Sequence, residues 1–415
     1  MLHVVMNGLV IGDLDGAGPR LRLRYDRAAT MGTGFVPLSV SLPATQYRWR
    51  GERVVTWLSA LLPDREGVLA RWRALFGIRS LAVEAMLAHV GEDVAGAAQF
   101  VRPDRLDTVL SRAGTLTPLT DDDIADLVRA ARRDALPYDP DTEIGHFSLA
   151  GAQSKFALQK TATGWALPSG AEPSTHIVKP AIPGLADQDV LEVVTMRLAR
   201  MLGLPAARTA LAAFGDERVI VIERYDRVRI DGVWYRVHQE DLCQALGVQP
   251  LMKYESQGGP GVARCAAVIR EHCPAADVET FARAVMLSYL TRGTDAHGRN
   301  YSLLITPGDI RLAPLYDLTT TFTFGERWAN RLAMRIGGLD RIDLIDRRHW
   351  SGFAHDVGCD EAWVHEELLG LASRIPDAVT TICDAPDLVD VTALFRGDLV
   401  DRAAGWCEAT RRRYG

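Results

Sequence analysis

The chain lacks the cysteine pattern of a zinc site or of a disulfide framework. Its six cysteines are scattered at positions 243, 265, 273, 359, 383 and 407, and no Cys-x-x-Cys occurs. We therefore expect free thiols in a cytoplasmic protein. The chain also lacks an apolar run of the roughly 18 residues that a membrane span needs. Its first residues show neither a basic region nor a long apolar region, so we expect no signal peptide.

Strong charge imbalance and repetition are absent too. A net charge of −6 argues against a chain that coats nucleic acid through bulk electrostatics. No internal repeat or low-complexity segment is evident. What remains is a chain of 415 residues, 47% of them hydrophobic, which is enough for two or three globular domains.

A predicted hairpin organises the most informative stretch. Two β-prone runs, 301–305 and 310–314, flank the turn Pro307-Gly308-Asp309. Antiparallel pairing across this turn sets Ile305 opposite Ile310. By the same register, residues just before the first strand and just after the second meet at the open end of the hairpin.

Three polar side chains gather at that open end. Asn300 precedes the first strand, Asp317 follows the second, and Asp295 lies in the loop that leads into the hairpin. Hard oxygen ligands suit Mg²⁺, which combines a few side chains with substrate phosphates. An Asp, an Asn five positions later and a further Asp after a hairpin follow the layout of a protein-kinase catalytic loop. The alternative is a polar turn whose Asp and Asn residues cap the backbone.

A loop of small residues, 148–155, precedes a strand-like run at 156–160. Small side chains allow backbone N–H groups to close over phosphates. The loop holds a single glycine, Gly151, so it matches neither a Walker loop nor a full Gly-x-Gly-x-x-Gly. A tight turn remains the alternative.

The strand 175–180 carries Lys179 on the same face as Ile177, which predicts an inward-pointing ammonium. A nucleotide kinase uses such a lysine on the phosphates. Glu192, in the helix predicted from about residue 188, is the candidate acidic partner. An exposed lysine at a strand end and a capping or solvated glutamate remain the alternatives.

These segments together resemble the HipA toxin kinases of bacterial toxin–antitoxin systems. The resemblance is specific between about residues 140 and 385, and it rests on the order and spacing of these strings: Ser148-Leu-Ala-Gly-Ala-Gln-Ser-Lys155, Thr175-His-Ile-Val-Lys179, Gln239-Glu-Asp-Leu-Cys-Gln244, Lys253-Tyr-Glu-Ser256, Gly258-Gly-Pro-Gly261, Thr294-Asp-Ala-His-Gly-Arg-Asn300 and Pro314-Leu-Tyr-Asp317. The strings Leu38-Ser-Val-Ser-Leu-Pro43, Leu61-Leu-Pro-Asp64 and Gly96-Ala-Ala-Gln-Phe100 resemble the small leading domain of that family.

The resemblance implies an α+β, two-lobed protein-kinase-like fold, with a β-rich N-terminal lobe and a helical C-terminal lobe. We expect a HipA N-terminal domain at 1–105, a helical connector at 106–143, a kinase core at 144–385 and a C-terminal helix and tail at 386–415. The implied activity is ATP- and Mg²⁺-dependent phosphorylation of serine, with an aminoacyl-tRNA synthetase as substrate and growth arrest as the result. The implied partner is a HipB-like helix-turn-helix antitoxin, which would bring the chain to operator DNA indirectly.

The resemblance also assigns roles to residues. Asp295 would be the catalytic aspartate, Asn300 and Asp317 would bind Mg²⁺ and take part in catalysis, and Lys179 would hold the α- and β-phosphates. The other implied nucleotide contacts are Ser148, Ala150, Gly151, Ala152 and Gln153 in the loop, backbone groups of Glu240 and Leu242 at the adenine, and His297.

Two of these positions carry open alternatives. Ser148 would be the autophosphorylated serine, but Ser154 stands where the family usually has an acid, and it supplies a second hydroxyl to the same loop. His297 could orient its loop, contact a ligand or make a structural hydrogen bond.

Two other functions remain open at this stage. One is a small-molecule or lipid kinase, because those enzymes share the Asp-x4-Asn spacing, although no basic amphipathic membrane face is evident. The other is a kinase-like corepressor that acts through its antitoxin on DNA. The complete set of Asp295, Asn300, Asp317 and Lys179 argues against an inactive kinase.

Overall fold

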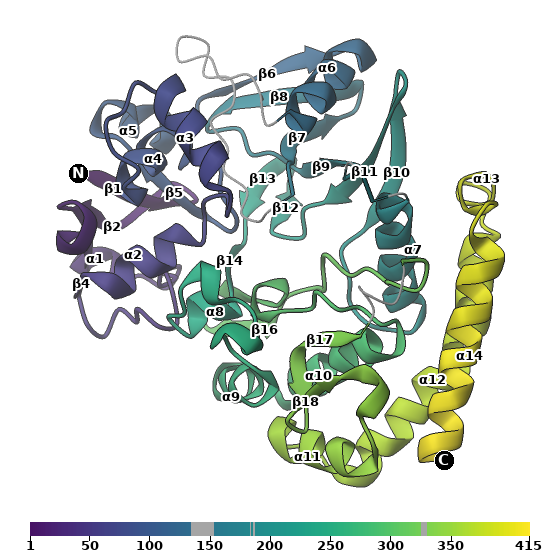
Figure 1. Ribbon diagram of the computed structural model, residues 1–415. Coiled ribbons are helices and arrows are strands. Elements are labelled where there is room, and N and C mark those ends of the chain that lie inside the picture. The colour runs from purple at the N-terminus through teal and green to yellow at the C-terminus, as the bar shows by residue number, and fades with distance from the viewer. Residues whose placement is uncertain (134–152, 183, 186, 325–329) are drawn as a thin grey trace.

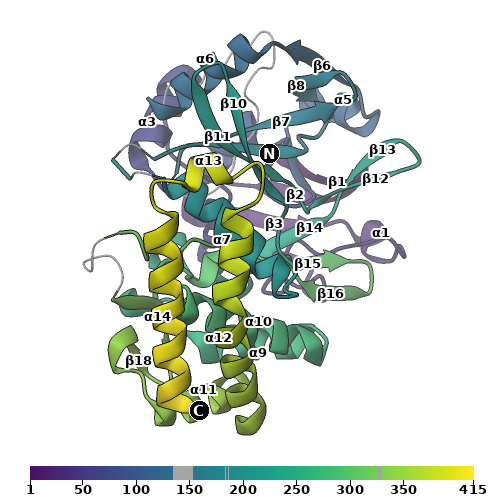
Figure 2. The ribbon, with the colours of Figure 1, turned by 90° about the vertical axis from the view of Figure 1, so that its right-hand side faces the viewer.

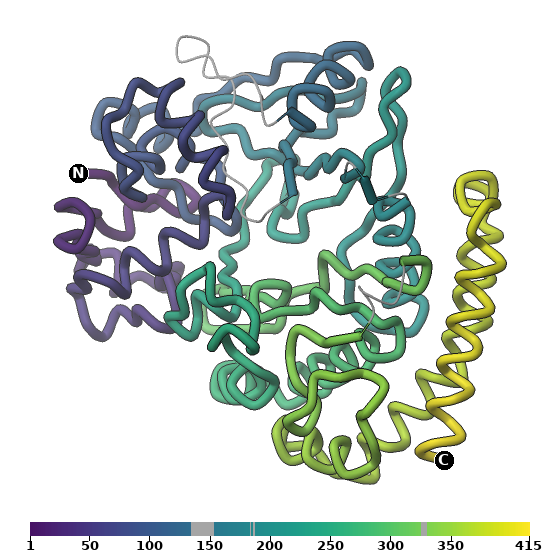
Figure 3. The backbone as a smooth tube through the Cα atoms, viewed as in Figure 1, coloured from purple at the N-terminus to yellow at the C-terminus, as the bar shows by residue number. Residues whose placement is uncertain are grey.

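The structure is a computed structural model that describes residues 1–133, 153–182, 184–185, 187–324 and 330–415. An N-terminal domain, a β-rich lobe and a helical lobe follow one another along the chain, as the change of colour in Figure 1 shows. This arrangement confirms the predicted two-lobed α+β fold. The trace in Figure 3 places the N-terminus and the C-terminus on opposite sides of the molecule.

The N-terminal domain is a five-stranded antiparallel sheet, in the order β4-β3-β2-β1-β5, covered by helices. Met6 pairs with Leu9 across a two-residue turn, and Asn7 and Gly8 both have positive φ angles, 48° and 86°. Both angles are those of the tight hairpin turn that the Asn-Gly pair favours. The elements of this domain are β1 (Leu2–Met6), β2 (Leu9–Asp15), β3 (Arg22–Tyr25), α1 (Arg27–Thr30), β4 (Arg48–Arg50), α2 (Glu52–Ser59), α3 (Glu66–Leu75), α4 (Val83–Val90) and β5 (Ala98–Val101).

The β-rich lobe is a six-stranded antiparallel sheet in the order β10-β11-β9-β7-β8-β6. The segment predicted as a connector supplies both the edge strand β6 and the helix α6, which begins at a capping box formed by Thr120 and Asp123. The elements here are α5 (Leu106–Leu110), β6 (Gly114–Leu119), α6 (Asp121–Arg132), β7 (Phe156–Thr161), β8 (Gly164–Gly170), β9 (His176–Pro180), α7 (Gln188–Met201), β10 (Thr209–Phe214) and β11 (Glu217–Glu223).

The two faces of this sheet pack against different helices. Val219 and Val221 belong to the core beneath α6, whereas Ile220 and Ile222 belong to the core that contains α7. Since side chains alternate along a strand, this assigns each side chain of β11, and of its partner residues on β9, to one face of the sheet. The face toward α7 is the one that borders the cleft described below.

The helical lobe forms around one large core that also includes α7. Its helices are α8 (Leu242–Ala245), α9 (Val262–His272), α10 (Ala275–Leu290), α11 (Arg347–Val357), α12 (Glu361–Cys383), α13 (Val389–Thr392) and α14 (Arg396–Tyr414), and its strands are β14 (His238–Asp241), β15 (Ser302–Thr306), β16 (Asp309–Leu312), β17 (Arg331–Ile336) and β18 (Leu339–Arg341). A hairpin of β12 (Arg227–Ile230) and β13 (Val233–Arg236) links the lobes.

The C-terminal segment packs as a helix along the helical lobe. Figure 2 shows α12 and α14 side by side, joined at one end by α13. Tyr414 is buried and its hydroxyl donates to the carbonyl of Ile345 at 2.6 Å, while Arg411 and Arg412 are exposed and pair with Glu408.

All six cysteines are free thiols, as the sequence predicted. A search of the described residues finds no helix with the length and apolar character to cross a membrane.

Candidate functional site

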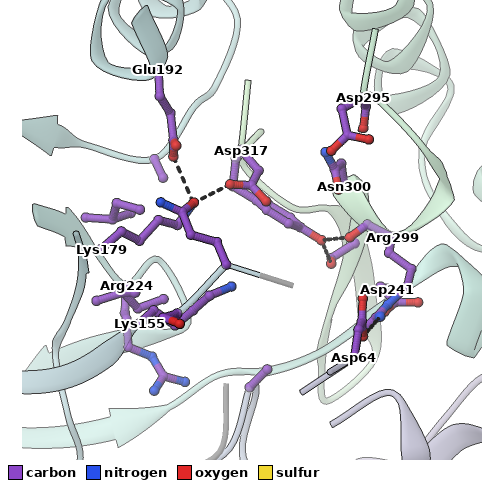
Figure 4. Close-up of a pocket in the computed structure, with 18 of the residues that line it drawn as sticks. Asp64, Lys155, Lys179, Glu192, Arg224, Asp241, Asp295, Arg299, Asn300 and Asp317 are labelled. Carbon is purple, nitrogen blue, oxygen red and sulfur yellow. Dashed lines mark hydrogen bonds and ion pairs between the residues drawn. The ribbon is translucent and has the colours of Figure 1, made fainter. Parts of the chain in front are cut away.

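A cleft of about 720 Å³ opens where the three parts of the molecule meet. Asp64 comes from the N-terminal domain, Lys179 from the β-rich lobe, and Asp295 from the helical lobe. Figure 4 shows these side chains turned toward a common space. The volume falls in the range typical of small-molecule and nucleotide sites.

Lys179 lies in this cleft because of the register of β9. It pairs with Ile220 on β11, and its side chain therefore points to the α7 side of the sheet. There its ammonium donates to Oε1 of Glu192 at 2.9 Å and to Oδ1 of Asp317. The predicted contact between Lys179 and Glu192 is present, and the same lysine reaches the aspartate that follows the hairpin.

These three groups share one electrostatic environment. Burial alone would raise the pKa of Asp317, but the ammonium groups of Lys179 and Lys155 outweigh it and hold that pKa well below its usual range. Burial also raises the pKa of Glu192, which Lys179 only partly offsets. The side chain of Asp317 is 42% exposed and lines the cleft, so it is a charged group that an incoming cation can reach.

Asp317 adopts a left-handed backbone conformation, with φ of 59°. Aspartate tolerates this region better than most residues, at a cost of order 1–3 kcal/mol. Such strain is often found where a side chain must be aimed at a ligand.

Lys155 is a second cation beside Lys179. Phe156 pairs with Val178 in an antiparallel register, so Lys155, the residue just before β7, lies alongside Lys179. Burial, together with the charge of Lys179, lowers the pKa of Lys155 to about 8. The sequence placed Lys155 in the small-residue loop but gave it no role.

The hairpin predicted after Asn300 is confirmed, with Ile305 paired to Ile310. At its open end the amide nitrogen of the Asn300 side chain donates to the carbonyl of Asp295 at 3.0 Å. Asn300 is buried at the end of a short 3-10 turn, Gly298–Asn300. Since the amide nitrogen is used within the loop, the amide oxygen is the atom suited to a metal.

Asp295 lies at the mouth of the cleft. Burial by the cleft walls raises the pKa of Asp295, although the Tyr254 hydroxyl and the charge of Lys253 oppose that effect. The Tyr254 hydroxyl donates to Oδ1 of Asp295 at 2.5 Å. In the sequence, the string Lys253-Tyr-Glu-Ser256 was only part of the family resemblance, and the contact between Tyr254 and Asp295 was not predicted.

The two predicted adenine contacts, Glu240 and Leu242, differ in their position relative to the cleft. Glu240 lines the cleft, but the amide of Leu242 already donates to the Tyr301 carbonyl at 2.9 Å, and its carbonyl accepts from Leu246 at 3.1 Å. The amide of Leu242 is therefore already used within the protein, whereas its carbonyl keeps a second lone pair, and the adenine contacts of Glu240 and Leu242 stay predictions.

The side chain of Glu240 is turned into the N-terminal domain. Its carboxylate accepts hydrogen bonds from Ser39 Oγ at 2.6 Å, Trp57 Nε1 at 2.8 Å and the Val40 amide at 2.8 Å. Burial raises the pKa of Glu240 to about 7, against the effect of these three donors. This carboxylate joins the N-terminal domain to the strand that borders the cleft.

His297 is buried, and its ring packs edge-on against that of Tyr254 with centroids 5.0 Å apart. Burial lowers its pKa to about 3, so the imidazole is neutral. Among the residues described, none makes a hydrogen bond to its Nδ1. Because this nitrogen lies beside the cleft and has no partner among the described residues, it is better suited to contact a ligand than to make the structural hydrogen bond considered from the sequence.

Only part of the small-residue loop belongs to the described chain. The side-chain amide of Gln153 donates to the carbonyl of Pro180 at 2.9 Å, which ties the end of the loop to the lysine strand. Arg65 donates to the hydroxyl of Ser154 at 3.4 Å. Ser148, Ala150, Gly151 and Ala152, all predicted nucleotide contacts, lie outside the described residues.

The donor set is compatible with Mg²⁺. Asp317 and Asn300 offer hard oxygen atoms, and the described residues contain no cluster of three or more His, Cys, Asp or Glu side chains arranged as a metal cage. Mg²⁺ usually binds through one or two carboxylates and completes its shell with water and substrate phosphates.

The fold and this set of side chains are those of a two-lobed, kinase-like protein. A family model described as the HipA-like C-terminal domain matches residues 147–379, and one described as the HipA N-terminal domain matches residues 2–101. The chain belongs to the HipA family of kinases.

Individual proteins agree with this assignment. The chain is 33% identical to the protein Y4mE of Sinorhizobium fredii, over 99% of this chain and 98% of that one. It is 28% identical to the serine/threonine-protein kinase toxin HipA of Shewanella oneidensis, over 98% and 95% of the two chains. It is also similar to a chain of the solved Shewanella oneidensis complex of HipA, HipB and operator DNA, with a TM-score of 0.83, 25% identity and 99% coverage of both chains.

Proposed function

We propose that this chain is an ATP- and Mg²⁺-dependent serine/threonine-protein kinase that arrests growth, with an aminoacyl-tRNA synthetase as its substrate in the cytoplasm. The single observation that carries the proposal is the joining of Lys179 to both Glu192 and Asp317 in the cleft that Asp295 and Asn300 also line. This set supplies a cationic clamp, hard oxygen ligands and a proton acceptor, which are what phosphoryl transfer requires.

In the proposed reaction, Asp295 accepts the proton of a serine hydroxyl as its oxygen bonds to the γ-phosphorus of ATP. The bond between that phosphorus and the β,γ-bridging oxygen breaks, which yields phosphoserine, ADP and one proton. Lys179 and Lys155 place positive charge near the phosphates, and Glu192 keeps the Lys179 ammonium in position. Mg²⁺, held by Asp317 and Asn300, would supply neutralisation of phosphate charge.

Phosphosite mass spectrometry in cells that briefly express the chain tests the substrate class, with the Asp295→Gln variant as a matched control. We expect a serine of an aminoacyl-tRNA synthetase to be phosphorylated only with the wild-type chain. Labelled ATP transferred to a metabolite or lipid and to no protein would replace this proposal with a small-molecule kinase. Equal phosphoproteomes for the two chains would favour a corepressor without kinase activity.

We also propose autophosphorylation in the small-residue loop, at Ser148 or at Ser154. Phosphate adds up to about two negative charges, which would repel the nucleotide from the same loop. Phosphopeptide mapping after incubation with Mg·ATP, with ATP affinity measured before and after, tests this. Phosphate on neither serine, or unchanged ATP affinity, would refute it.

The proposed partner is a HipB-like helix-turn-helix antitoxin that carries the chain to operator DNA. The net charge of −6 gives the chain poor intrinsic affinity for DNA, and the similar HipA chain was solved in a complex with HipB and its operator. Gel-shift titrations should show specific binding by the complex. Tight, sequence-specific binding by the purified chain alone would contradict the proposal.

A further inference from the structure

The N-terminal domain reaches the loop of Asp295 and Asn300 through the carboxylate of Asp64 and the carbonyl of Ala60. Asp64 lies between α2 and α3, and its side chain is only 10% exposed. One oxygen accepts from Nη1 of Arg299 at 2.5 Å and the other accepts from Nζ of Lys253 at 3.3 Å. Figure 4 shows Asp64 and Asp241 on either side of the Arg299 guanidinium.

Arg299 directly precedes Asn300 and is firmly held. Besides Asp64, its guanidinium donates to Oδ2 of Asp241 at 3.1 Å and to the carbonyl of Ala60 at 2.9 Å. Its own carbonyl accepts from the Tyr316 hydroxyl at 2.6 Å. The backbone from which the Asn300 amide projects is therefore fixed by contacts on both sides.

Lys253 connects Asp64 to the other end of the same loop. It directly precedes Tyr254, whose hydroxyl donates to Asp295. The Asp64 carboxylate thus holds two side chains. One is Arg299, which precedes the proposed metal ligand Asn300. The other is Lys253, which precedes Tyr254, the residue that contacts the proposed base. These contacts come from a domain outside the two lobes.

We propose that Asp64 is a positioning residue for phosphoryl transfer, so that the N-terminal domain completes the kinase site instead of merely covering it. This inference rests on the proposed function. Asp64 acts through Arg299 and Lys253, and it sets the geometry of Asn300 and Asp295. Displacement of a reacting group by about 1 Å can lower a rate by 10²-fold, which is the scale of effect expected here.

The test compares Asp64→Asn, which keeps the shape but loses the charge, with a control at another contact of the N-terminal domain. Asn7 exchanges two hydrogen bonds with the Arg236 backbone, at 2.8 and 3.0 Å, and neither residue lines the cleft. Asn7→Gly removes these bonds and tolerates the positive φ at that position. Its effect measures the cost of loosening the interface without touching the catalytic loop.

The first readout is the initial rate of phosphate transfer from radiolabelled Mg·ATP to the chain itself, with the ATP concentration at half-maximal rate and the Tm. We expect Asp64→Asn to lower the maximal rate by about 10- to 100-fold, with a half-maximal ATP concentration within about threefold of wild type and a Tm close to that of Asn7→Gly. Asp64→Glu should regain part of the rate. A rate within twofold of wild type for Asp64→Asn, or an equal loss in Asn7→Gly, would overturn the inference.

The second readout does not depend on activity. Hydrogen–deuterium exchange of the peptides that cover 291–303 should be faster in Asp64→Asn than in wild type and unchanged in Asn7→Gly. Unchanged exchange in Asp64→Asn would overturn the positioning role even in a chain that transfers no phosphate. Absence of phosphate transfer by the wild-type chain, both to itself and to any other protein, would instead refute the proposed function.

Discussion

The Tyr254 hydroxyl donates a hydrogen bond to Oδ1 of Asp295, the carboxylate proposed to accept the proton of the substrate. The donor favours the charged form of Asp295, whereas burial favours the protonated form and prevails in setting the direction of the pKa. One of the contributions that oppose burial at the proposed base therefore comes from a single oxygen atom.

Tyr254→Phe removes only that oxygen. We expect a further increase in the pKa of Asp295, and therefore a shift of the acidic limb of the pH–rate profile to higher pH. The measurement is kcat/KM for ATP, followed from about pH 5 to pH 9, because its pH dependence reports the pKa values of groups in the free enzyme. Tyr47→Phe, on the exposed surface of the N-terminal domain, is the control. A profile of Tyr254→Phe that moves toward lower pH would contradict the expected direction.

Asp317 and Asp295 should separate nucleotide binding from chemistry. Asp317→Ala should weaken Mg·ATP binding and abolish transfer, because the proposed metal loses its carboxylate. Asp295→Asn should leave ATP affinity largely intact and lower turnover by roughly 10²–10⁴, the usual size of a general-base loss. Isothermal titration with Mg·ATP and transfer assays measure the two effects, and an equal loss of ATP affinity in both variants would refute this division.

Lys179 should matter for stability as well as for activity. Its side chain is 5% exposed and that of Glu192 is 1% exposed, so Lys179→Met leaves a buried carboxylate without its cation. Removal of one partner of a buried ion pair typically costs about 3–5 kcal/mol of unfolding free energy. Urea denaturation measures this cost. The double variant with Glu192→Leu should regain part of the lost stability. A double variant less stable than Lys179→Met would show that the loss does not come from the unpaired carboxylate of Glu192.

Glu240 should make stability depend on pH. Its pKa is raised from 4.5 to about 7 in the folded chain. The stabilisation linked to its protonation is fully present below about pH 4.5 and is lost as pH rises through about 7, with a total near 3 kcal/mol. Glu240→Gln should flatten this part of the profile. Urea unfolding of both chains at about pH 5 and pH 8 provides the comparison, and parallel profiles would exclude the contribution of Glu240.

The sequence by itself determined those parts of the site that depend on local periodicity. The turn Pro307-Gly308-Asp309 set the register of Ile305 with Ile310, and that register brought Asn300 and Asp317 to one end of a hairpin. Alternation along β9 put Lys179 on the inward face, where Glu192 meets it. Within a strand or hairpin, the backbone geometry allows few arrangements, so spacing alone is informative.

Only the tertiary structure decided which distant segments complete the cleft. Asp64 and Arg299 are 235 positions apart, and Glu240 meets Ser39 across 201 positions. Likewise, the tertiary structure showed that the amide of Leu242 donates to the carbonyl of Tyr301 and that segment 114–119 is the edge strand of the β-rich lobe. An aspartate after a proline looks like an ordinary loop residue in the sequence. Its role depends on burial beside a particular arginine, and that burial arises only when the two domains pack together.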